Sequence, residues 1–266
     1  MVVRLAARHR ALLTVIHSGQ MSTQTPPHQH VSVVSRFLHW LGGHELGTLA
    51  LLAGITAAIW VFAEVAEEVL ENSTRTFDEA VLLAMRNPAD LSDPLGPPWL
   101  EELGRDITAL GGIGVLALLA AAVIGYLLLS DKRRAAAVLT LAVGGGLLLS
   151  PALKGVFERP RPDLVPHGSV VYTASFPSGH SMMAATVYLT MAALLARVHQ
   201  RKRIKAYLLL VALTATFLVG LSRIYLGVHW PTDVFAGWAA GAAWALCCWL
   251  VAHRLQQRGK MEPESE

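Results

Sequence analysis

Charged residues are scarce in this chain. Asp, Glu, Lys and Arg make up 15% of its 266 residues, and 53% of the residues are hydrophobic, whereas an average globular protein carries about 25% charged residues. The mean hydropathy is +0.45. The long apolar stretches also lack the polar stripe that helices of a soluble protein show. This shortage argues against a soluble helical protein and indicates a membrane protein.

Cysteine is almost absent, which excludes a disulfide framework. The two cysteines, Cys247 and Cys248, are neighbours inside the last apolar stretch, and we interpret them as small apolar side chains. The histidines that precede the first apolar stretch have no regular metal-binding spacing. We therefore expect no metal and no cofactor. The net charge of +3 is explained by membrane topology, so we expect no nucleic-acid partner.

Six apolar stretches are long enough, or nearly so, to cross a bilayer, which takes about 20 residues. They run approximately from Leu46 to Val65, Ile107 to Leu129, Ala135 to Leu153, His180 to Val198, Ala206 to Leu221, and Val234 to Ala252. The predicted fold is all-α, a bundle of six transmembrane helices. We expect residues 1–45 to form a flexible cytoplasmic segment, residues 46–253 the six-span domain, and residues 254–266 a polar cytoplasmic tail.

Basic residues lie in the segments that six spans would place on one side of the membrane. They occur before the first span, at 131–134, at 197–205 and after the sixth span. Since Lys and Arg favour cytoplasmic loops, both termini are predicted to be cytoplasmic. The three polar clusters described below then face outward. The pattern is typical of a multi-pass protein of a bacterial inner (plasma) membrane.

The first outer loop, residues 71–106, is predicted to contain a short amphipathic helix. Thr76 and Glu79 resemble a capping box, and Phe77, Val81 and Met85 recur every four residues. Such a helix would lie at the membrane surface. It would either help to admit a lipid or serve as a structural cover.

Three clusters of polar residues lie at the ends of apolar stretches. They are Lys154-Gly-Val-Phe-Glu-Arg159-Pro-Arg161-Pro162, Phe176-Pro177-Ser178-Gly179-His180, and Ser222-Arg223-Ile-Tyr-Leu-Gly-Val-His229-Trp-Pro-Thr-Asp233. Several cations, two histidines and an aspartate suit a phosphate ester. Cations bind the anion, one imidazole attacks phosphorus, and the other protonates the leaving group.

Individual residues fit roles around a phosphoryl group. Lys154, Arg161 and Arg223 supply positive charge, and arginine can bind two oxygens at once. Arg159 is a further candidate, although it would equally suit lipid headgroups. Ser178 and Gly179 begin the fourth span, where free backbone N–H groups attract anions.

His229 and Asp233 lie four residues apart, so they share a face if that turn is helical. Asp233 would then fix the tautomer of His229 and leave the other ring nitrogen free to attack. Alternatively, Asp233 caps the sixth span together with Thr232.

Taken together, the pattern Lys-x6-Arg-Pro, Pro-Ser-Gly-His and Ser-Arg-x5-His-x3-Asp resembles the type 2 phosphatidic acid phosphatase superfamily, also called lipid phosphate phosphatases. All three motifs match in order, from Lys154 to Asp233. The resemblance covers roughly the last four spans, and the first 100 residues match only in general layout.

The resemblance implies a metal-independent phosphatase acting on a membrane lipid phosphate, with an outward-facing active site. His229 would be the nucleophile that forms a phosphohistidine, Asp233 would orient it, and His180 would protonate the leaving group. The phosphoryl oxygens would be bound by Lys154, Arg161, Ser178, Gly179 and Arg223. For a bacterial member, phosphatidate, phosphatidylglycerophosphate and undecaprenyl diphosphate are the expected substrates.

Two other functions fit some of these features. A lipid phosphotransferase would use the same intermediate and pass the phosphoryl group to another lipid. An anion transporter would need charges deep within the spans, where the sequence has almost none. Vanadate-dependent haloperoxidases share the phosphate-site pattern, but they are soluble.

Overall fold

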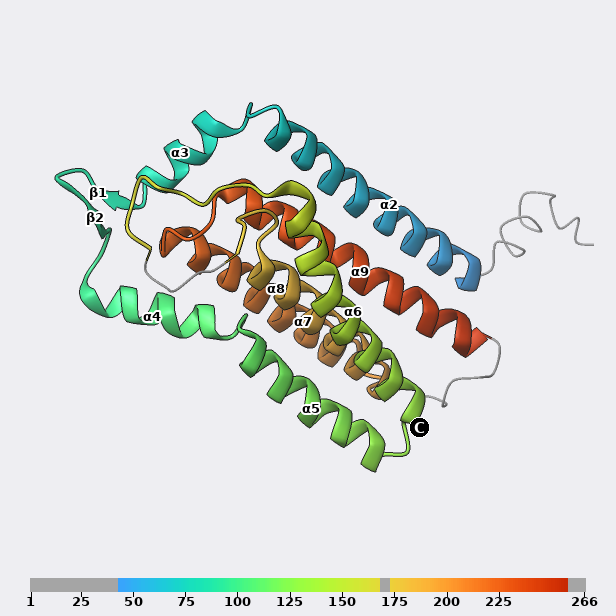
Figure 1. Cartoon of the computed structure of the whole chain (residues 1–266). Coiled ribbons are helices and arrows are strands. Elements are labelled where there is room, and N and C mark those ends of the chain that lie inside the picture. Colours follow the sequence, from blue (N-terminus) through green and yellow to red (C-terminus); the bar gives the residue numbers. More distant parts are fainter. Residues whose placement is uncertain (1–42, 168–172, 258–266) are drawn as a thin grey trace, which may run out of the picture. The chain divides into compact units, whose positions relative to one another are not determined.

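The structure, a computed structural model, describes residues 43–167 and 173–257, and it is built almost entirely from helices (Figure 1). The helices are α2 (Gly43–Leu70), α3 (Arg75–Leu83), α4 (Pro98–Ala109), α5 (Ile113–Leu129), α6 (Arg133–Phe157), α7 (Gly179–Val198), α8 (Lys202–Tyr225) and α9 (Pro231–Gln257). A small antiparallel hairpin, β1 (Arg86–Asn87) and β2 (Asp90–Pro94), lies between α3 and α4. The prediction of an all-α membrane bundle is confirmed.

Five helices in the described residues are individually long and apolar enough to cross a membrane, namely α2, α6, α7, α8 and α9. The remaining candidate span is a bent pair, in which α4 and α5 meet at 50°. The predicted second span, approximately Ile107 to Leu129, is therefore not one continuous helix. The chain breaks after Ala109, and Gly112 adopts an extended conformation before α5 begins at Ile113. Glycine has a low helix propensity, so the Gly111–Gly112 pair favours a break at this place.

Helix α7 packs against α5, α6, α8 and α9, and α2 packs against α9. Glycines allow the contact between α7 and α9. A β-carbon on Gly241 would lie 2.4 Å from the carbonyl oxygen of Met182, and one on Gly237 would lie 2.7 Å from that of Ser178. The Gly237-x-x-x-Gly241 pair therefore permits close packing of the two helices. Because of this contact, the first turn of α9 lies beside the start of α7.

Helix α3 differs from its predicted form. It begins at Arg75, one residue before the proposed capping box, and its N-terminus has no side-chain cap. Glu79 instead forms an ion pair with Arg75. The fully buried side chains are Asp78 and Leu82, whereas Phe77 is half-exposed. The helix is amphipathic as predicted, but its buried face carries a carboxylate and packs against α9.

The predicted domain boundaries are partly outside the described residues. Residues 1–42 and 258–266 are not described, so the flexible N-terminal segment and most of the polar tail remain predictions. At the described ends, α2 already begins at Gly43 and α9 continues to Gln257.

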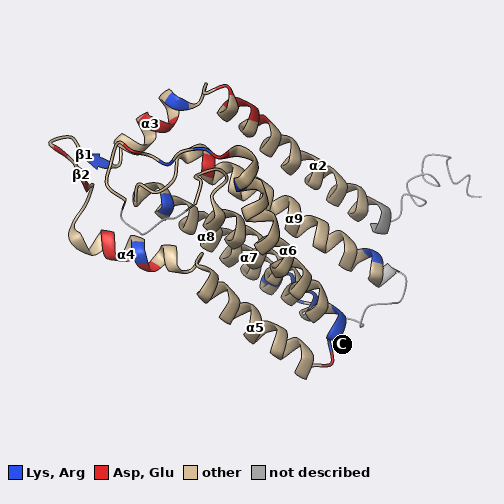
Figure 2. Cartoon of the chain, in the orientation of Figure 1, with Lys and Arg blue, Asp and Glu red and all other residues tan. Residues whose placement is uncertain are grey.

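Charged residues gather at the two ends of the helices. Figure 2 shows acidic residues at the end where α2 meets α3 and on α4, and basic residues at the opposite end, where α5 joins α6 and α7 joins α8. The three polar clusters of the sequence lie at the first of these ends, because the C-terminus of α6, the N-terminus of α7 and the α8–α9 connection are all located there.

Candidate active site

A cavity of about 410 Å³ lies where the three sequence motifs meet. Six of the predicted site residues line it: Lys154, Arg161, Gly179, His180, Arg223 and His229. The two others, Ser178 and Asp233, are fully buried and do not line it. Apolar side chains, among them Ile113, Leu147 and Met183, complete the lining. The cavity therefore combines clustered positive charge with an apolar wall.

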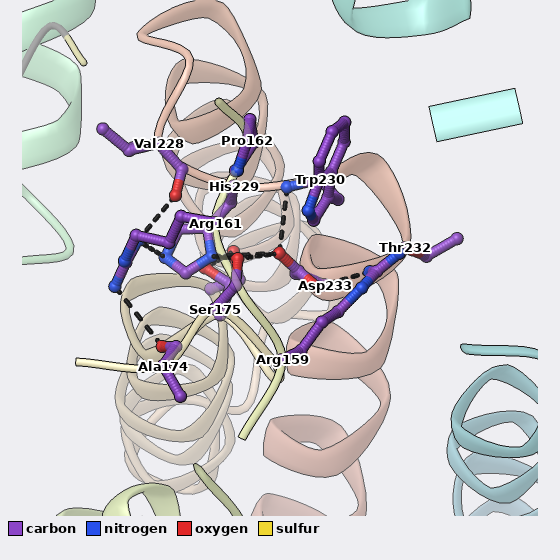
Figure 3. A network of polar contacts seen from close by, with 12 residues as sticks. Arg159, Arg161, Pro162, Ala174, Ser175, Val228, His229, Trp230, Thr232 and Asp233 are labelled. Atoms are coloured by element: carbon purple, nitrogen blue, oxygen red, sulfur yellow. Dashed lines mark hydrogen bonds and ion pairs between the residues drawn. The ribbon is translucent and has the colours of Figure 1, made fainter. Parts of the chain in front are cut away.

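His229 lies between Arg161 and Asp233 (Figure 3). Its Nε2 is 3.1 Å from Nη1 of Arg161, and its Nδ1 is 3.3 Å from Oδ2 of Asp233. A guanidinium group can only donate hydrogen bonds, so Nε2 is the acceptor and the ring proton lies on Nδ1. Nδ1 then donates to Asp233. This tautomer leaves the lone pair of Nε2 on the side of the ring where Arg161 donates to it.

Burial keeps His229 neutral. The side chain is almost fully buried, and burial lowers its pKa from 6.5 to about 3, although the hydrogen bond from His229 to Asp233 acts in the opposite direction. Burial has this effect because a low-dielectric surrounding disfavours the imidazolium form. Near neutral pH the imidazole is therefore unprotonated at Nε2 and able to act as a nucleophile.

The lowered pKa of His229 predicts how this histidine titrates. In protein labelled with ¹³C-histidine, we expect the ring signal of His229 to remain unchanged from pH 8 to pH 5, because its pKa lies below that window. A solvated histidine such as one in a flexible segment would titrate near pH 6.5. The signal is assigned by its absence in His229→Ala. A midpoint between pH 6 and 7 for this signal would contradict the buried, neutral state.

Asp233 accepts several hydrogen bonds besides the one from His229. The backbone N–H of Trp230 donates to Oδ2 at 2.9 Å, and the hydroxyl of Ser175 donates to the same oxygen. The two interpretations of Asp233 therefore hold together, because it satisfies an N–H group at the start of α9 and also binds the ring of His229. Ser175 belongs to no motif, and sequence reasoning missed it.

Arg159 lies in the same network and does not face lipid headgroups. Its side chain is only 11% exposed, and its Nη1 donates to Oδ1 of Asp233 at 2.7 Å. Its Nη2 donates to Oδ2 of Asp78 on α3 at 2.8 Å. Sequence reasoning left both alternatives open for Arg159, and the structure assigns it to the carboxylates.

The three cavity cations are held by the protein backbone and by α4. Arg161 donates to the carbonyl oxygens of Thr173 and Val228, at 2.8 and 2.5 Å. Lys154, in the last turn of α6, donates to the carbonyl of Ala174. Arg223 donates to Oγ1 of Thr108 on α4 at 2.9 Å. These bonds fix the positions of the cations, so a phosphate ester meets a preformed set of donors.

The start of α7 brings His180 to the cavity. Ser178 occupies the N-cap position, but its side chain makes no capping bond. Its hydroxyl accepts from Ser181 at 2.9 Å. A β-carbon on Gly179 would lie 3.1 Å from Oγ of Ser150, so glycine at this position allows α6 and α7 to approach closely. Ser178 thus contributes to the helix end, while Gly179 and His180 line the cavity.

The arrangement can perform phosphoryl chemistry with side chains alone. It provides a neutral imidazole, a second imidazole and three cations around one cavity. Among residues 43–167 and 173–257, no group of three or more His, Cys, Asp or Glu side chains is arranged to hold a metal ion.

Comparisons with known proteins agree with this geometry. The family model described as "PAP2 superfamily" matches residues 135–257. Phosphatidylglycerophosphatase B of Bacillus subtilis (strain 168) is 34% identical over 183 residues, which cover 68% of this chain and 85% of that protein. Decaprenylphosphoryl-5-phosphoribose phosphatase of Mycolicibacterium smegmatis is 39% identical over 169 residues, covering 60% of this chain and 81% of that protein.

A solved structure has the same fold. It is the crystal structure of a transmembrane PAP2-type phosphatidylglycerolphosphate phosphatase from Bacillus subtilis, with a TM-score of 0.66 and 32% identity, covering 73% of this chain and 93% of that one. The family resemblance inferred from the three motifs is confirmed, and with it the prediction of a membrane-embedded phosphatase. This chain therefore belongs to the PAP2 superfamily.

Proposed function

We propose that this protein hydrolyses a phosphate monoester or diphosphate of a membrane lipid through a phosphohistidine intermediate. The observation that best supports this proposal is the setting of His229. Its Nε2 accepts a hydrogen bond from Arg161, and its Nδ1 donates one to Asp233. Lys154 and Arg223 line the same cavity. A neutral imidazole oriented by a carboxylate and surrounded by cations is suited to attack phosphorus.

In the proposed first step, Nε2 of His229 attacks phosphorus and the bond from phosphorus to the leaving oxygen breaks. His180 donates a proton to that oxygen. Lys154, Arg161 and Arg223 bind the remaining oxygens, over which negative charge spreads in the transition state. Asp233 stabilises the positive charge that develops on the ring of His229.

In the second step, water attacks the phosphohistidine and the bond from phosphorus to Nε2 breaks. His180, unprotonated after the first step, accepts a proton from the water. Inorganic phosphate leaves, and His229 returns to its neutral form. Gly179 and Ser178 would support both steps through the N-terminus of α7, where unpaired backbone N–H groups favour an anion.

The substrate class follows from the cavity lining. Cations line it beside Ile113, Leu147 and Met183, so a lipid can place its phosphate among the cations while apolar atoms near the headgroup contact the wall. We propose phosphatidate, phosphatidylglycerophosphate and undecaprenyl diphosphate as candidate substrates. The charged side chains would bind the phosphoryl group that these lipids share.

The orientation in the membrane is also a proposal. The basic residues gathered at the end opposite the cavity include Lys132, Arg133 and Arg134 (Figure 2). Since basic loops favour the cytoplasm, we propose that the cavity opens on the outer side of a bacterial inner membrane. Labelling of a single cysteine introduced at Asp90 by a membrane-impermeant maleimide, in intact spheroplasts of a variant lacking Cys247 and Cys248, tests this orientation. Labelling only after lysis would reverse it.

Phosphate release from defined lipids tests the function. The purified protein in detergent is given phosphatidate, phosphatidylglycerophosphate and undecaprenyl diphosphate separately, each ³²P-labelled at the terminal phosphate. Release of inorganic phosphate supports the proposal, and the ranking of kcat/KM identifies the preferred lipid. Label that moves to another lipid would indicate a phosphotransferase. A folded protein that acts on none of the three would refute the proposed substrate class.

The proposed mechanism predicts the response to two inhibitors. Vanadate should inhibit in competition with the lipid, because it mimics the phosphoryl group among the cations and His229. EDTA should leave the rate unchanged, because side chains supply all the positive charge in the proposed steps. Initial rates with and without each reagent check both effects. Loss of activity in EDTA that magnesium restores would contradict the metal-independent steps.

A further inference from the structure

Asp78 is a buried carboxylate outside the residues that the family model matches. It lies on α3, is 0% exposed, and precedes the matched residues 135–257. Its Oδ1 accepts the backbone N–H of Thr232 at 3.0 Å, and its Oδ2 accepts Nη2 of Arg159 at 2.8 Å. The hydroxyl of Thr232 also contacts both oxygens. Both carboxylate oxygens of Asp78 therefore bind groups that lie next to Asp233.

Arg159 bridges two buried carboxylates. Its Nη2 contacts Asp78 and its Nη1 contacts Oδ1 of Asp233 at 2.7 Å, while Oδ2 of Asp233 accepts from Nδ1 of His229. Figure 3 shows part of this series of contacts, from Arg159 through Asp233 to His229. The guanidinium of Arg159 also lies 5.7 Å from the ring centroid of Trp230. Neither carboxylate is exposed, so water screens these charges only weakly.

We propose that Asp78 is a positioning residue for the His229–Asp233 pair and that it acts through Arg159. This inference rests on the proposed function, in which His229 carries the phosphoryl group. Asp78 would hold Arg159 in place and balance the positive charge of Arg159, so that Asp233 remains an effective partner for the ring of His229.

The charges explain why a second carboxylate is needed. Without Asp78, the single positive charge of Arg159 would face Asp233 alone and neutralise its effect on His229. With Asp78 present, the three groups carry one net negative charge beside a ring that becomes positive when Nε2 bonds to phosphorus. Asp78 should therefore favour the transition state over the substrate complex, which changes kcat more than KM.

The test compares two neighbouring carboxylates on α3. Asp78→Asn removes a charge that contacts Arg159, and Glu79→Gln removes one that pairs with Arg75 instead. We expect Asp78→Asn to lower kcat by about 10- to 100-fold. This is the range seen in metal sites when a residue that orients a metal-binding side chain is lost. KM and the affinity for vanadate should stay near the wild-type values, and Glu79→Gln should retain the wild-type kcat. Equal kcat values for Asp78→Asn and wild type would overturn the proposal.

A folding defect is separated from a positioning defect by measuring single-turnover phosphorylation with the fastest substrate of the lipid panel. The rate constant counts only sites that become phosphorylated, so misfolded molecules do not contribute. We expect a slower rate constant at full amplitude in Asp78→Asn. A reduced amplitude with the wild-type rate constant would show a purely structural role and overturn the proposal.

A double-mutant cycle tests the route through Arg159. If Asp78 acts through Arg159, the variant carrying both Asp78→Asn and Arg159→Met should be no slower than Arg159→Met alone. Multiplied losses in the double variant would overturn that route. Absence of phosphate release by the wild type would instead refute the proposed function, so the two failures can be distinguished.

Discussion

Replacing His229 with alanine is expected to reduce phosphate release by about 10⁴-fold or more, the scale of loss when an enzyme's nucleophile is removed. The reason is that Nε2 of His229 is the atom proposed to bond to phosphorus, and alanine leaves nothing in its place. The cations of the cavity would remain. Rates are measured on the preferred lipid with purified wild type and His229→Ala, alongside trapping of the ³²P-labelled enzyme in alkali, where phosphohistidine survives.

The matched control for this variant is His253→Ala. His253 lies on α9 near its C-terminal end, far along the helix from the cavity, and its loss should leave the rate unchanged. Wild-type turnover by His229→Ala would refute the proposed mechanism. Labelled phosphohistidine in His229→Ala would assign the nucleophile to His180 instead, which is the alternative that the residues alone leave open.

Replacing His180 with alanine is expected to slow the reaction by an amount that depends on the leaving group. General acid catalysis contributes about 10²- to 10⁴-fold, and an alkyl alkoxide needs that proton most. We therefore expect a loss in this range for phosphatidate, whose leaving group is an alcohol. The loss should be much smaller for undecaprenyl diphosphate or for an aryl phosphate, because these leaving groups are stable anions.

The measurement for His180 is the rate constant of phosphoenzyme formation with each substrate, which isolates the step that needs the acid. His167→Ala is a suitable control, because His167 contacts the carbonyl of Pro162 at 2.7 Å without lining the cavity. Equal losses on all substrates would show that His180 does not act as the acid, while the role of His229 would stand.

The charged and the apolar parts of the cavity have different roles in the proposed function. In the proposed function, the charged residues would bind the phosphoryl group, which all the candidate lipids share. The similar proteins differ in the lipids that they are named for, phosphatidylglycerophosphate in one case and a decaprenylphosphoryl sugar phosphate in another. Selectivity among lipids would then depend on the apolar wall, where Ile113, Leu147 and Met183 lie.

The spans were predictable because each apolar stretch is continuous in the sequence. The exception was the second span. The apolar pattern extends upstream of Ile113, but Gly111 faces Val219 and His180, with a β-carbon position only 2.4 Å from Val219. This close contact with α7 and α8 decides where the chain bends, and it cannot be read from the residues of α4 and α5 alone.

The sequence by itself determined the all-α membrane fold and the residues proposed to bind phosphate, because local runs of apolar residues form spans and because each of the three motifs is a short local pattern. The tertiary structure alone decided the partners of those residues. Asp78 lies 81 residues from Arg159, and Thr108 lies 115 residues from Arg223. Such pairs leave no local pattern in the sequence. A buried carboxylate and a buried hydroxyl acquire their roles only when distant helices pack together and exclude water from the charges between them.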